Sequence, residues 1–266
     1  MAVECLNQVD WQAPWLAPLA KLGAPVAQAW GQGQPVAEAL NAALATQSAP
    51  AQASADALPS PNGLPLCVPQ SSLPPGEAYE AFIRRTGHLP TRDNRHDFFN
   101  GLMWLHQPAW KLRLNRLQAE AIAAQGAPTT RGPLRDALTL FDENGAVLQV
   151  PAPLLAALRE RRWHDLFVTH RALWREARFT LVGHALLDSL CTAPRKGLTA
   201  HVLLADPLSL STQDWAQKPF CPLPVMGLPG WWTDGPQDAA FYADAGVFRP
   251  SARSLPPTGN AHPCRS

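Results

Sequence analysis

The sequence predicts an α+β fold in which N-terminal helices pack on a small mixed sheet. In the first half of the chain, apolar residues recur every three or four positions, as they do on the buried face of a helix. From residue 136 onward, short β-rich runs alternate with helical segments. After Asp206 the chain is rich in Pro, Gly and Trp without a sustained period, which predicts an irregular C-terminal arm.

We expect a single domain over residues 1–266, with four successive parts. Residues 1–47 are predicted as a helical N-terminal part, clearest in PVAEALNAALAT, which begins at Pro35. Residues 48–76 are predicted as an Ala/Ser/Pro-rich loop, in which GLPLCVP lies extended over the core. Residues 77–206 are predicted to form the α+β core, and residues 207–266 the Pro/Trp-rich arm.

The core begins with three predicted helices. AYEAFIRRTG predicts a short helix that ends at Gly87, because glycine readily adopts the left-handed conformation that closes many helices. Asp93 or Asn94 can cap the next helix, which runs to about Gln107. PAWKLRLNRLQAEAIAAQG then predicts a third, amphipathic helix.

The second half of the core is predicted as strands and helices in alternation. DALTLFDENGAVLQV has the strongest hairpin signal in the chain, with two β-like runs around Asn144 and Gly145. PLLAALRERRWHDLF returns to a helical period. ARFTLVG is predicted as a strand, HALLDSL as a helix that begins directly after it, and GLTAHVLLA as another strand. The predicted sheet therefore contains a β-hairpin.

Composition and missing motifs argue against several classes of function. Lys and Arg total 22 against 21 Asp and Glu, so no basic field indicates a nucleic-acid partner. No apolar run reaches about 18 residues, the length that a membrane-spanning helix needs, so no membrane is expected as a partner. The motifs GxSxG, GxxxxGK[ST], GxGxxG and HExxH are all absent, which argues against a serine hydrolase and against a nucleotide cofactor.

The cysteines and the first residues indicate a cytoplasmic protein. The five cysteines are odd in number and scattered without a CxxC pair, so we expect neither a disulfide framework nor structural zinc. The N-terminal stretch MAVECLNQVDWQAPW contains early acidic residues and no apolar segment, unlike a signal peptide. A reducing cytoplasmic compartment fits both observations.

The segment TRDNRHDFFN is the strongest candidate site, because it is densely polar in a chain with only 16% charged residues. In the predicted helix, His96 and Asn100 lie one turn apart on one face, with Asp97 on an adjoining stripe. Arg92 and Asp93 precede the helix. A helix N-terminus favours a neutral imidazole, which can ligate a metal or act as a base. The alternative is that these residues only cap the helix and bond to neighbouring loops.

The segment VGHALLDSL is a second candidate site. His184 and Asp188 are separated by one helical turn, so both side chains can meet one ion or one substrate proton. Gly183 permits a tight turn between strand and helix, and functional sites often gather at such junctions. The alternative is a surface His–Asp pair that contributes a few tenths of a kcal/mol.

Five further polar residues are considered in three places along the chain. Arg135 and Asp136 stand at the entrance of the predicted hairpin, as a buried pair or an anion clamp. Asp142 and Glu143 stand at its tip, where acidic residues usually serve the turn and solubility. Thr199 lies on a strand face that would serve a ligand only by lining a pocket.

Four stretches are long enough to be specific: TGHLPTRDNRHDFFNGLMWLHQPAWKLRLNRLQAEAI, RGPLRDALTLFDENGAVL, VGHALLDSL with GLTAH, and PLPVMGLPGWW with FYADAGVFRP. They resemble a bacterial family known only as the domain of unknown function 3025 family. The resemblance covers nearly everything from about residue 64 onward. It implies a common fold and a bacterial origin, and it carries over no activity and no catalytic residue.

Two hypotheses of function follow. In the first, the protein is a hydrolase-like enzyme with a His/Asp site that works with or without a divalent metal such as Zn, Mn or Fe. The candidate catalytic and metal-ligating residues are His96, Asp97, His184 and Asp188. The candidate binding residues for a small polar or anionic substrate are Arg92, Asp93, Asn100, Arg135 and Thr199.

In the second hypothesis the protein is a non-catalytic ligand- or protein-binding protein, and the same polar residues form a structural hydrogen-bond network. Nucleic-acid binding through the arginines is a weaker third reading. Geometry separates the first two. The enzyme hypothesis predicts that the side chains of His96 and His184 come within about 8 Å of each other in a concave pocket.

Overall fold

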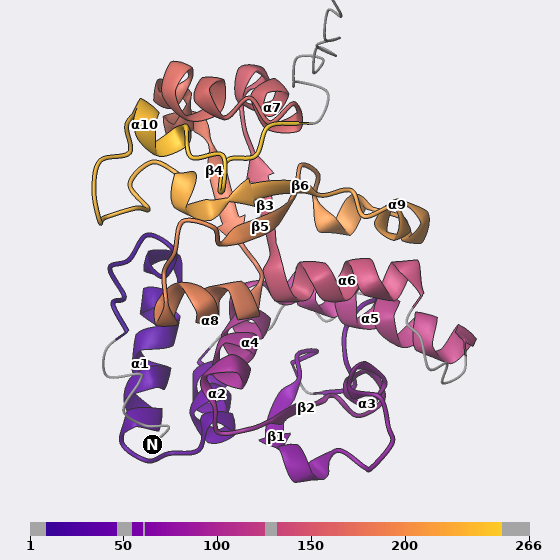
Figure 1. Ribbon diagram of the computed structural model, residues 1–266. Helices are drawn as coiled ribbons and strands as arrows, with labels where there is room; N and C mark the ends of the chain where they lie inside the picture. Colours follow the sequence, from indigo (N-terminus) through magenta and orange to yellow (C-terminus); the bar gives the residue numbers. More distant parts are fainter. Residues whose placement is uncertain (1–8, 47–54, 61, 126–131, 252–266) are drawn as a thin grey trace, which may run out of the picture.

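The structure, a computed structural model, describes residues 9–46, 55–60, 62–125 and 132–251 (Figure 1). The expectations for residues 1–8, 47–54, 61, 126–131 and 252–266 lie outside the described residues. The helices of the described chain are α1 (Ala20–Gly31), α2 (Val36–Ala45), α3 (Tyr79–Thr86), α4 (Arg95–His106), α5 (Pro108–Gln125), α6 (Pro133–Asn144), α7 (Ala152–Arg159), α8 (His184–Thr192), α9 (Thr212–Ala216) and α10 (Ala239–Tyr242). The strands are β1 (Leu66–Pro69), β2 (His88–Thr91), β3 (Gly145–Gln149), β4 (Arg178–Leu181), β5 (Thr199–Leu203) and β6 (Cys221–Pro224). The predicted α+β class is confirmed.

The strands form two small sheets. The larger has the order β4-β3-β5-β6, and it is mixed, because β3 is antiparallel to β4 and parallel to β5, while β5 and β6 are antiparallel. The smaller pairs β1 with β2 in parallel. In Figure 1 the larger sheet lies above α8 and α6, and the smaller lies beside α3 at the other end of the molecule.

The predicted hairpin around Asn144 and Gly145 is wrong. The first of its two β-like runs belongs to α6, and the Asn-Gly pair marks the point where this helix passes directly into β3. Pro133 occupies the first turn of α6, and Ala137 and Phe141 lie on one helical face, fully buried. Burial of that apolar face outweighs the local turn preference of Asn-Gly. Gly145 has a φ of −80° in its role as the helix C-cap, far from the left-handed region that a hairpin turn requires.

The N-terminal part is helical, as expected, and its helices α1 and α2 pack on α4. Trp30 of α1 stacks on Phe98 of α4, with ring centroids 5.6 Å apart. Leu40 of α2 lies against Gly101 of α4, where an added Cβ would come within 2.2 Å of the leucine side chain. The close approach of α2 to α4 therefore depends on a glycine in α4.

The expected extended course of GLPLCVP is confirmed for its last four residues, Leu66–Pro69, which form β1, whereas Gly63 lies in a bend with a φ of 69°. Asn41 of α2 binds this strand through both ends of its amide, since its Nδ2 donates to the carbonyl of Cys67 and its Oδ1 accepts from the Cys67 N–H, each at 2.8 Å. An asparagine thus takes the place of a neighbouring strand on one side of β1. The other side pairs with β2, which leads into α4.

The C-terminal arm is partly irregular, as expected, but it also completes the larger sheet. Its strand β6 pairs with β5, and Trp215 of α9 is fully buried against Phe141 of α6, with centroids 5.3 Å apart. Farther on, Phe241 and Phe248 pack together in the main hydrophobic core at 5.5 Å. Aromatic burial fixes the arm where backbone periodicity does not.

The helices α4 and α8 lie side by side below the larger sheet in Figure 1. Gly87 ends α3 in the left-handed conformation with a φ of 68°, as predicted from the sequence. Of the two predicted cap candidates, Asp93 and Asn94, it is Asn94 that caps α4. The helix α8 begins at His184, directly after β4 and a two-residue step. Among the described residues, no helix combines the length and the apolar character needed to cross a membrane.

Candidate functional site

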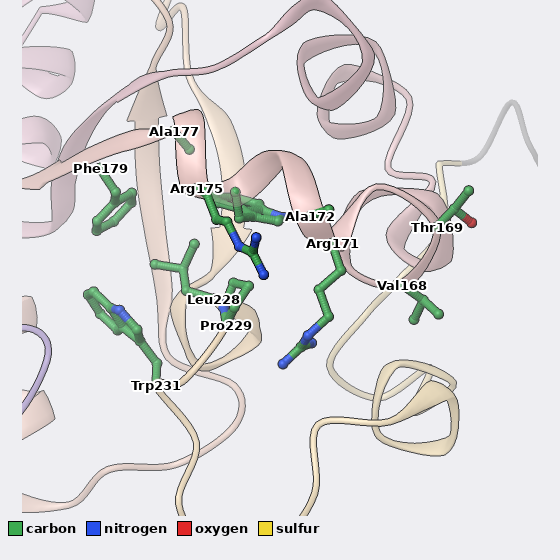
Figure 2. A pocket seen from close by; sticks show the side chains of 11 residues that line it. Val168, Thr169, Arg171, Ala172, Arg175, Ala177, Phe179, Leu228, Pro229 and Trp231 are labelled. Carbon is green, nitrogen blue, oxygen red and sulfur yellow. The ribbon is translucent and has the colours of Figure 1, made fainter.

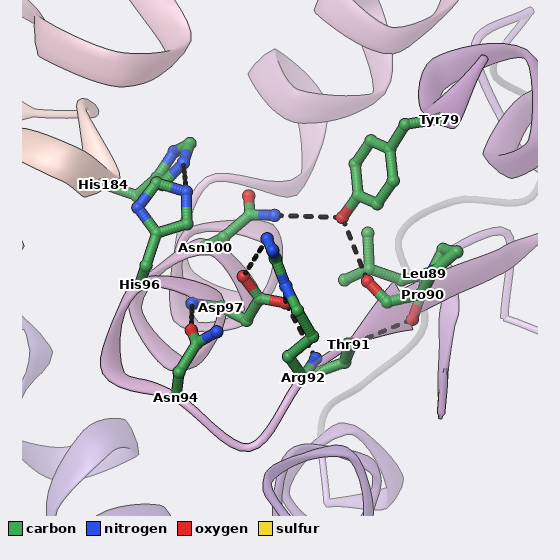
Figure 3. A network of polar contacts seen from close by, with 10 residues as sticks. All are labelled: Tyr79, Leu89, Pro90, Thr91, Arg92, Asn94, His96, Asp97, Asn100 and His184. Carbon is green, nitrogen blue, oxygen red and sulfur yellow. Dashed lines mark hydrogen bonds and ion pairs between the residues drawn. The ribbon is translucent and has the colours of Figure 1, made fainter. Parts of the chain in front are cut away.

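Two histidines from different helices meet in a polar cavity. His96 is the second residue of α4, and His184 is the first residue of α8. Their Nε2 atoms are 3.2 Å apart, and their rings meet edge to face with centroids 4.6 Å apart (Figure 3). Both line a cavity of about 310 Å³ whose walls are mostly polar. The predicted proximity of the two imidazoles is confirmed.

The position of His96 follows from the start of α4. The side chain of Asn94 accepts a hydrogen bond from the N–H of Asp97 at 2.8 Å, which is the usual N-cap arrangement. The Asp97 carboxylate in turn accepts from the backbone N–H of Arg92 at 2.7 Å and from its guanidinium at 3.1 Å. This local network fixes the first turn of α4 and directs His96 toward α8 (Figure 3).

The position of His184 follows from an unusually close backbone contact. At Gly183 an added Cβ would lie 2.5 Å from the Cα of Asn144 and 2.6 Å from the carbonyl oxygen of Glu143. The carbonyl of Gly145 also accepts from the N–H groups of Val182 and Gly183, at 2.9 and 2.8 Å. Only glycine at position 183 lets the N-terminus of α8 touch the C-terminus of α6.

That contact brings a carboxylate from α6 to the histidines. The Oε2 of Glu143 lies 3.5 Å from Nε2 of His184. Three potential ligand atoms lie within 4.8 Å of one another, one each from His96, Glu143 and His184. Two imidazole nitrogens and a carboxylate oxygen are a ligand set that Zn, Mn and Fe accept. The three side chains lie close enough together to hold one metal ion.

A second carboxylate stands behind His184. Asp142 Oδ2 is 3.8 Å from Nδ1 of His184, on the ring side opposite Glu143. Asp142 itself pairs with the ammonium group of Lys111, which is only 3% exposed and also donates to Asn100 Oδ1 at 2.9 Å. A carboxylate hydrogen-bonded to the second nitrogen commonly supports a metal-ligating imidazole, but here the separation is too long for a hydrogen bond and Nδ1 has no hydrogen-bond partner among the described residues.

Burial sets the protonation of these groups. Burial lowers the pKa of His184 to about 4, with the charges of Lys111 and His96 acting in the same direction and that of Asp142 opposing them. Burial raises the pKa of Asp142, but the charges of Lys111 and the two histidines outweigh it, so the net pKa is lowered. At neutral pH His184 is therefore a neutral imidazole and Asp142 a carboxylate.

The opposite wall of the cavity is a chain of hydrogen bonds (Figure 3). Asn100 Nδ2 donates to the hydroxyl of Tyr79 at 3.2 Å, and this hydroxyl donates to the carbonyl of Pro90 at 3.3 Å. Burial, followed by the charges of Asp97 and Asp142, raises the pKa of Tyr79 well above its usual value, so it is a neutral phenol.

The sequence-predicted residues divide into two groups. The structure brings Arg92, His96, Asp97, Asn100 and His184 to the cavity. It places Asp93, Arg135, Thr199 and Asp188 elsewhere, outside the described lining of that cavity.

Each residue of the second group has a local setting of its own. Asp188 pairs with Arg95 of α4, so it ties the two helices together on their outer side. Asp93 accepts from the N–H of Val36 at 2.7 Å and thereby holds the start of α2. Thr199 donates to the carbonyl of Gly197 at 3.0 Å.

Arg135 belongs to α6 rather than to a strand entrance. Its Nε is buried and forms no hydrogen bond with the described residues. The neighbouring Asp136 lies 3.8 Å from the ammonium of Lys218 and is half exposed, so these two adjacent residues do not pair with each other as a buried unit.

Sequence reasoning missed Glu143, Asp142 and Lys111. The sequence predicts Glu143 and Asp142 at a hairpin tip, whereas they occupy the last turn of α6. The signal that could have found them is the helical spacing of Ala137 and Phe141 after Pro133, which continues to the Asn-Gly pair. Lys111 shows no such signal, because its burial depends on partners from α4 and α6.

These observations define the protein as an α+β chain with a His/Glu cluster on a polar cavity. The chain belongs to the family described as "Protein of unknown function (DUF3025)", whose model matches residues 66–209 and 203–252. The match includes His96, Glu143 and His184, and it confirms the resemblance of the sequence motifs. No curated protein and no solved structure matches the chain.

Proposed function

We propose that this protein is a hydrolase-like enzyme whose site holds a divalent metal ion between His96, Glu143 and His184. The observation that carries the proposal is the approach of their three ligand atoms to within 4.8 Å of one another on the wall of a polar cavity. The proposal replaces Asp97 and Asp188 as ligands with Glu143, because Asp97 is paired with Arg92 and Asp188 with Arg95.

The donor set fits hydrolytic chemistry. Two histidines and one glutamate leave a coordination position open for water, whose pKa a zinc ion lowers to about 7. Asp142 lies 3.8 Å from Nδ1 of His184, beyond hydrogen-bond distance, so it acts on this ring through its charge, while Nε2 of the same ring faces His96 and Glu143. Burial keeps that ring neutral, which is the form that binds a metal.

The remaining cavity wall suits a small polar substrate. Arg92 and Asn100 present amide and guanidinium donors, while Gln118 and Thr139 from α5 and α6 add further hydrogen-bonding groups. A volume of about 310 Å³ lies at the lower end of the range typical of small-molecule sites. The substrate is therefore expected to be small and rich in hydrogen-bonding groups.

Metal analysis of protein purified without an affinity tag tests the proposal. We expect about one Zn²⁺ or Mn²⁺ per chain by mass spectrometry and saturable rebinding by calorimetry after chelation. His96→Ala, Glu143→Ala and His184→Ala should each lose this binding, and His88→Ala is the matched control, because His88 is exposed and outside the described lining of the cavity. Binding that persists in all three cavity variants would refute the proposed site.

Hydrolysis is tested separately with chromogenic acetate, phosphate and phosphodiester probes. The metal-loaded wild-type protein should hydrolyse at least one probe, and Glu143→Ala should abolish that activity. Metal binding without turnover of any probe would count against catalysis and favour a binding role.

The alternative proposal is a non-catalytic ligand- or protein-binding protein, in which these residues form a structural network. The hydrogen bonds that join Arg92 to Asp97 and Asn100 to Tyr79 favour this alternative for that half of the cavity. Under this alternative, His96→Ala and His184→Ala lower the free energy of unfolding without changing any metal content.

We also place the protein in the cytoplasm. Cys67, Cys191 and Cys221 are free thiols, which supports a reducing compartment. Fractionation of the native host cell tests this, and recovery of the protein with the periplasmic or extracellular fraction would contradict it.

A further inference from the structure

A second cavity lies away from the histidines, between the 3-10 segment Arg171–Glu176 and the chain around Leu228 (Figure 2). Its volume is about 700 Å³, which falls within the range typical of small-molecule sites. Aromatic and aliphatic side chains from β4 and the C-terminal arm form one side, and two arginines form the other.

The two arginines carry charge that the cavity does not balance. Figure 2 shows the guanidinium groups of Arg171 and Arg175 pointing into the same open space. Among the described residues, no Asp or Glu lines this cavity, and neither arginine forms an ion pair. Arg171 is held by weak hydrogen bonds to the Tyr242 hydroxyl at 3.3 Å and to the carbonyl of Gln237 at 3.4 Å. The cavity therefore offers a concentrated positive potential.

The apolar wall is preformed by a side-chain clamp. Gln237 Nε2 donates to the carbonyls of Met226 and Leu228, each at 2.8 Å, and its Oε1 accepts from the N–H of Gly230 at 2.8 Å. Gly230 has a φ of 82°, a left-handed conformation that glycine adopts without strain. The turn that presents Trp231 is thus fixed before any ligand arrives, so binding need not order it.

The wall also presents aromatic surface. Trp231 meets Phe179 of β4 at a ring-centroid distance of 5.4 Å and an interplanar angle of 89°. Both rings line the cavity together with Leu228 (Figure 2). A flat apolar group can pack on these faces while a charged group attached to it reaches the arginines.

We propose that this cavity binds a small organic anion: a carboxylate or phosphate group joined to a flat, ring-containing apolar body. Arg171 and Arg175 bind the anionic group through charge-assisted hydrogen bonds, for which a guanidinium fork is well suited. Trp231, Phe179 and Leu228 contact the ring. This site is separate from the His96/Glu143/His184 centre and does not depend on its function.

Titration of the full-length wild-type protein with 2-naphthoate and 2-naphthyl phosphate tests the proposal, and 2-naphthalenemethanol serves as the neutral analogue of the same shape. We expect saturable binding of at least one anion by calorimetry, with quenching of tryptophan fluorescence. That anion should bind at least about tenfold more tightly than the alcohol, and added salt should weaken the binding of the anion. The preference between the two anions distinguishes a carboxylate site from a phosphate site.

Variants locate the binding. The double variant Arg171→Gln/Arg175→Gln should bind the anion at least about tenfold more weakly, because both charge-assisted bonds are lost. Arg178→Gln is the matched control, since Arg178 is an exposed arginine of the adjoining strand outside the described lining. All substituted side chains are exposed, and circular dichroism verifies the fold. The proposal is overturned if neither anion binds saturably, if the alcohol binds as tightly as the anion, or if the double variant binds as the wild type does.

Discussion

Lys111→Met removes the buried ammonium group on which the polar network depends. Lys111 Nζ pairs with Asp142, donates to Asn100 Oδ1 at 2.9 Å, and lies 5.3 Å from the ring centroid of Trp104. Methionine preserves most of the aliphatic volume but supplies neither charge nor donor. Asp142 then lacks its cation, and the Asn100 carbonyl lacks a hydrogen bond.

The structure sets the size of the effect. Breaking a buried ion pair by removing one partner costs about 3–5 kcal/mol. We expect about 3 kcal/mol, the lower end, because the Asp142 side chain is 20% exposed and water can reach it. Burial is the largest cause of the lowered pKa of His184 and remains in the variant, so we expect His184 to stay neutral at neutral pH and not to replace the lost cation. For a chain of this size the melting temperature should fall by roughly 6–12 °C.

Acid should narrow the difference in the free energy of unfolding between the wild type and Lys111→Met. The pKa of Asp142 is lowered in the folded state, so its ion pair contributes stability that is present above the unfolded pKa of about 3.9 and is lost as the pH falls through the folded pKa. The wild type loses that contribution in acid, whereas Lys111→Met does not have it.

Urea unfolding followed by circular dichroism, at neutral pH and at about pH 2.5, measures the free energy of unfolding. Lys21→Met, an exposed lysine of α1, is the matched control. The double variant Lys111→Met/Asp142→Asn should recover part of the loss, because no uncompensated carboxylate remains. A Lys111→Met protein within about 0.5 kcal/mol of the control would refute the reasoning.

Three further predictions concern single positions. Gly183→Ala should lower the free energy of unfolding by about 1–3 kcal/mol in urea, because the added Cβ would lie 2.5 Å from backbone. Gly197→Ala is the control, because its Cβ would meet open space, and it should leave the free energy of unfolding nearly unchanged. Equal effects of the two substitutions would contradict the close contact at Gly183. Burial depresses the pKa of His184, so the wild type, with a chelator present, should lose stability progressively as the pH falls from about 6.5 to about 4, by at most about 3 kcal/mol. His184→Gln should make the free energy of unfolding less dependent on pH in that window. An unchanged pH dependence in this variant would argue against a buried neutral ring. Asn41→Ala should cost about 2–4 kcal/mol by leaving both backbone groups of Cys67 without a side-chain partner, and wild-type stability of this variant would show that water replaces the amide.

The sequence predicted the part of the site that depends on local chemistry. Asn94 is a standard N-cap, and the Asp97 N–H that it binds lies three residues away. Gly183 marks a tight strand-to-helix step, and the helix that follows it has a clear apolar period. Because these signals fix the starts of α4 and α8, the meeting of His96 and His184 was predictable.

The missing half of the site depends on contacts distant in the chain. Asn-Gly is a strong hairpin signal, but the apolar face of α6 is buried against Trp215, which lies far along the sequence. The local sequence signal therefore predicts Glu143 in a hairpin turn, although the residue lies at the end of α6. Lys111 was equally hidden, because a lysine in an amphipathic helix is usually solvated unless an opposing carboxylate holds it.

The outer strand β6 of the larger sheet affects whether that border can pair with a strand from another molecule. β6 forms one border of that sheet and has the sequence Cys-Pro-Leu-Pro. Pro222 and Pro224 have no N–H group, so this border cannot offer a regular row of donors to a strand from another molecule. The same proline content that disrupts regular structure in the arm thus protects this border of the sheet, but not the opposite border formed by β4, from pairing with a strand of another molecule.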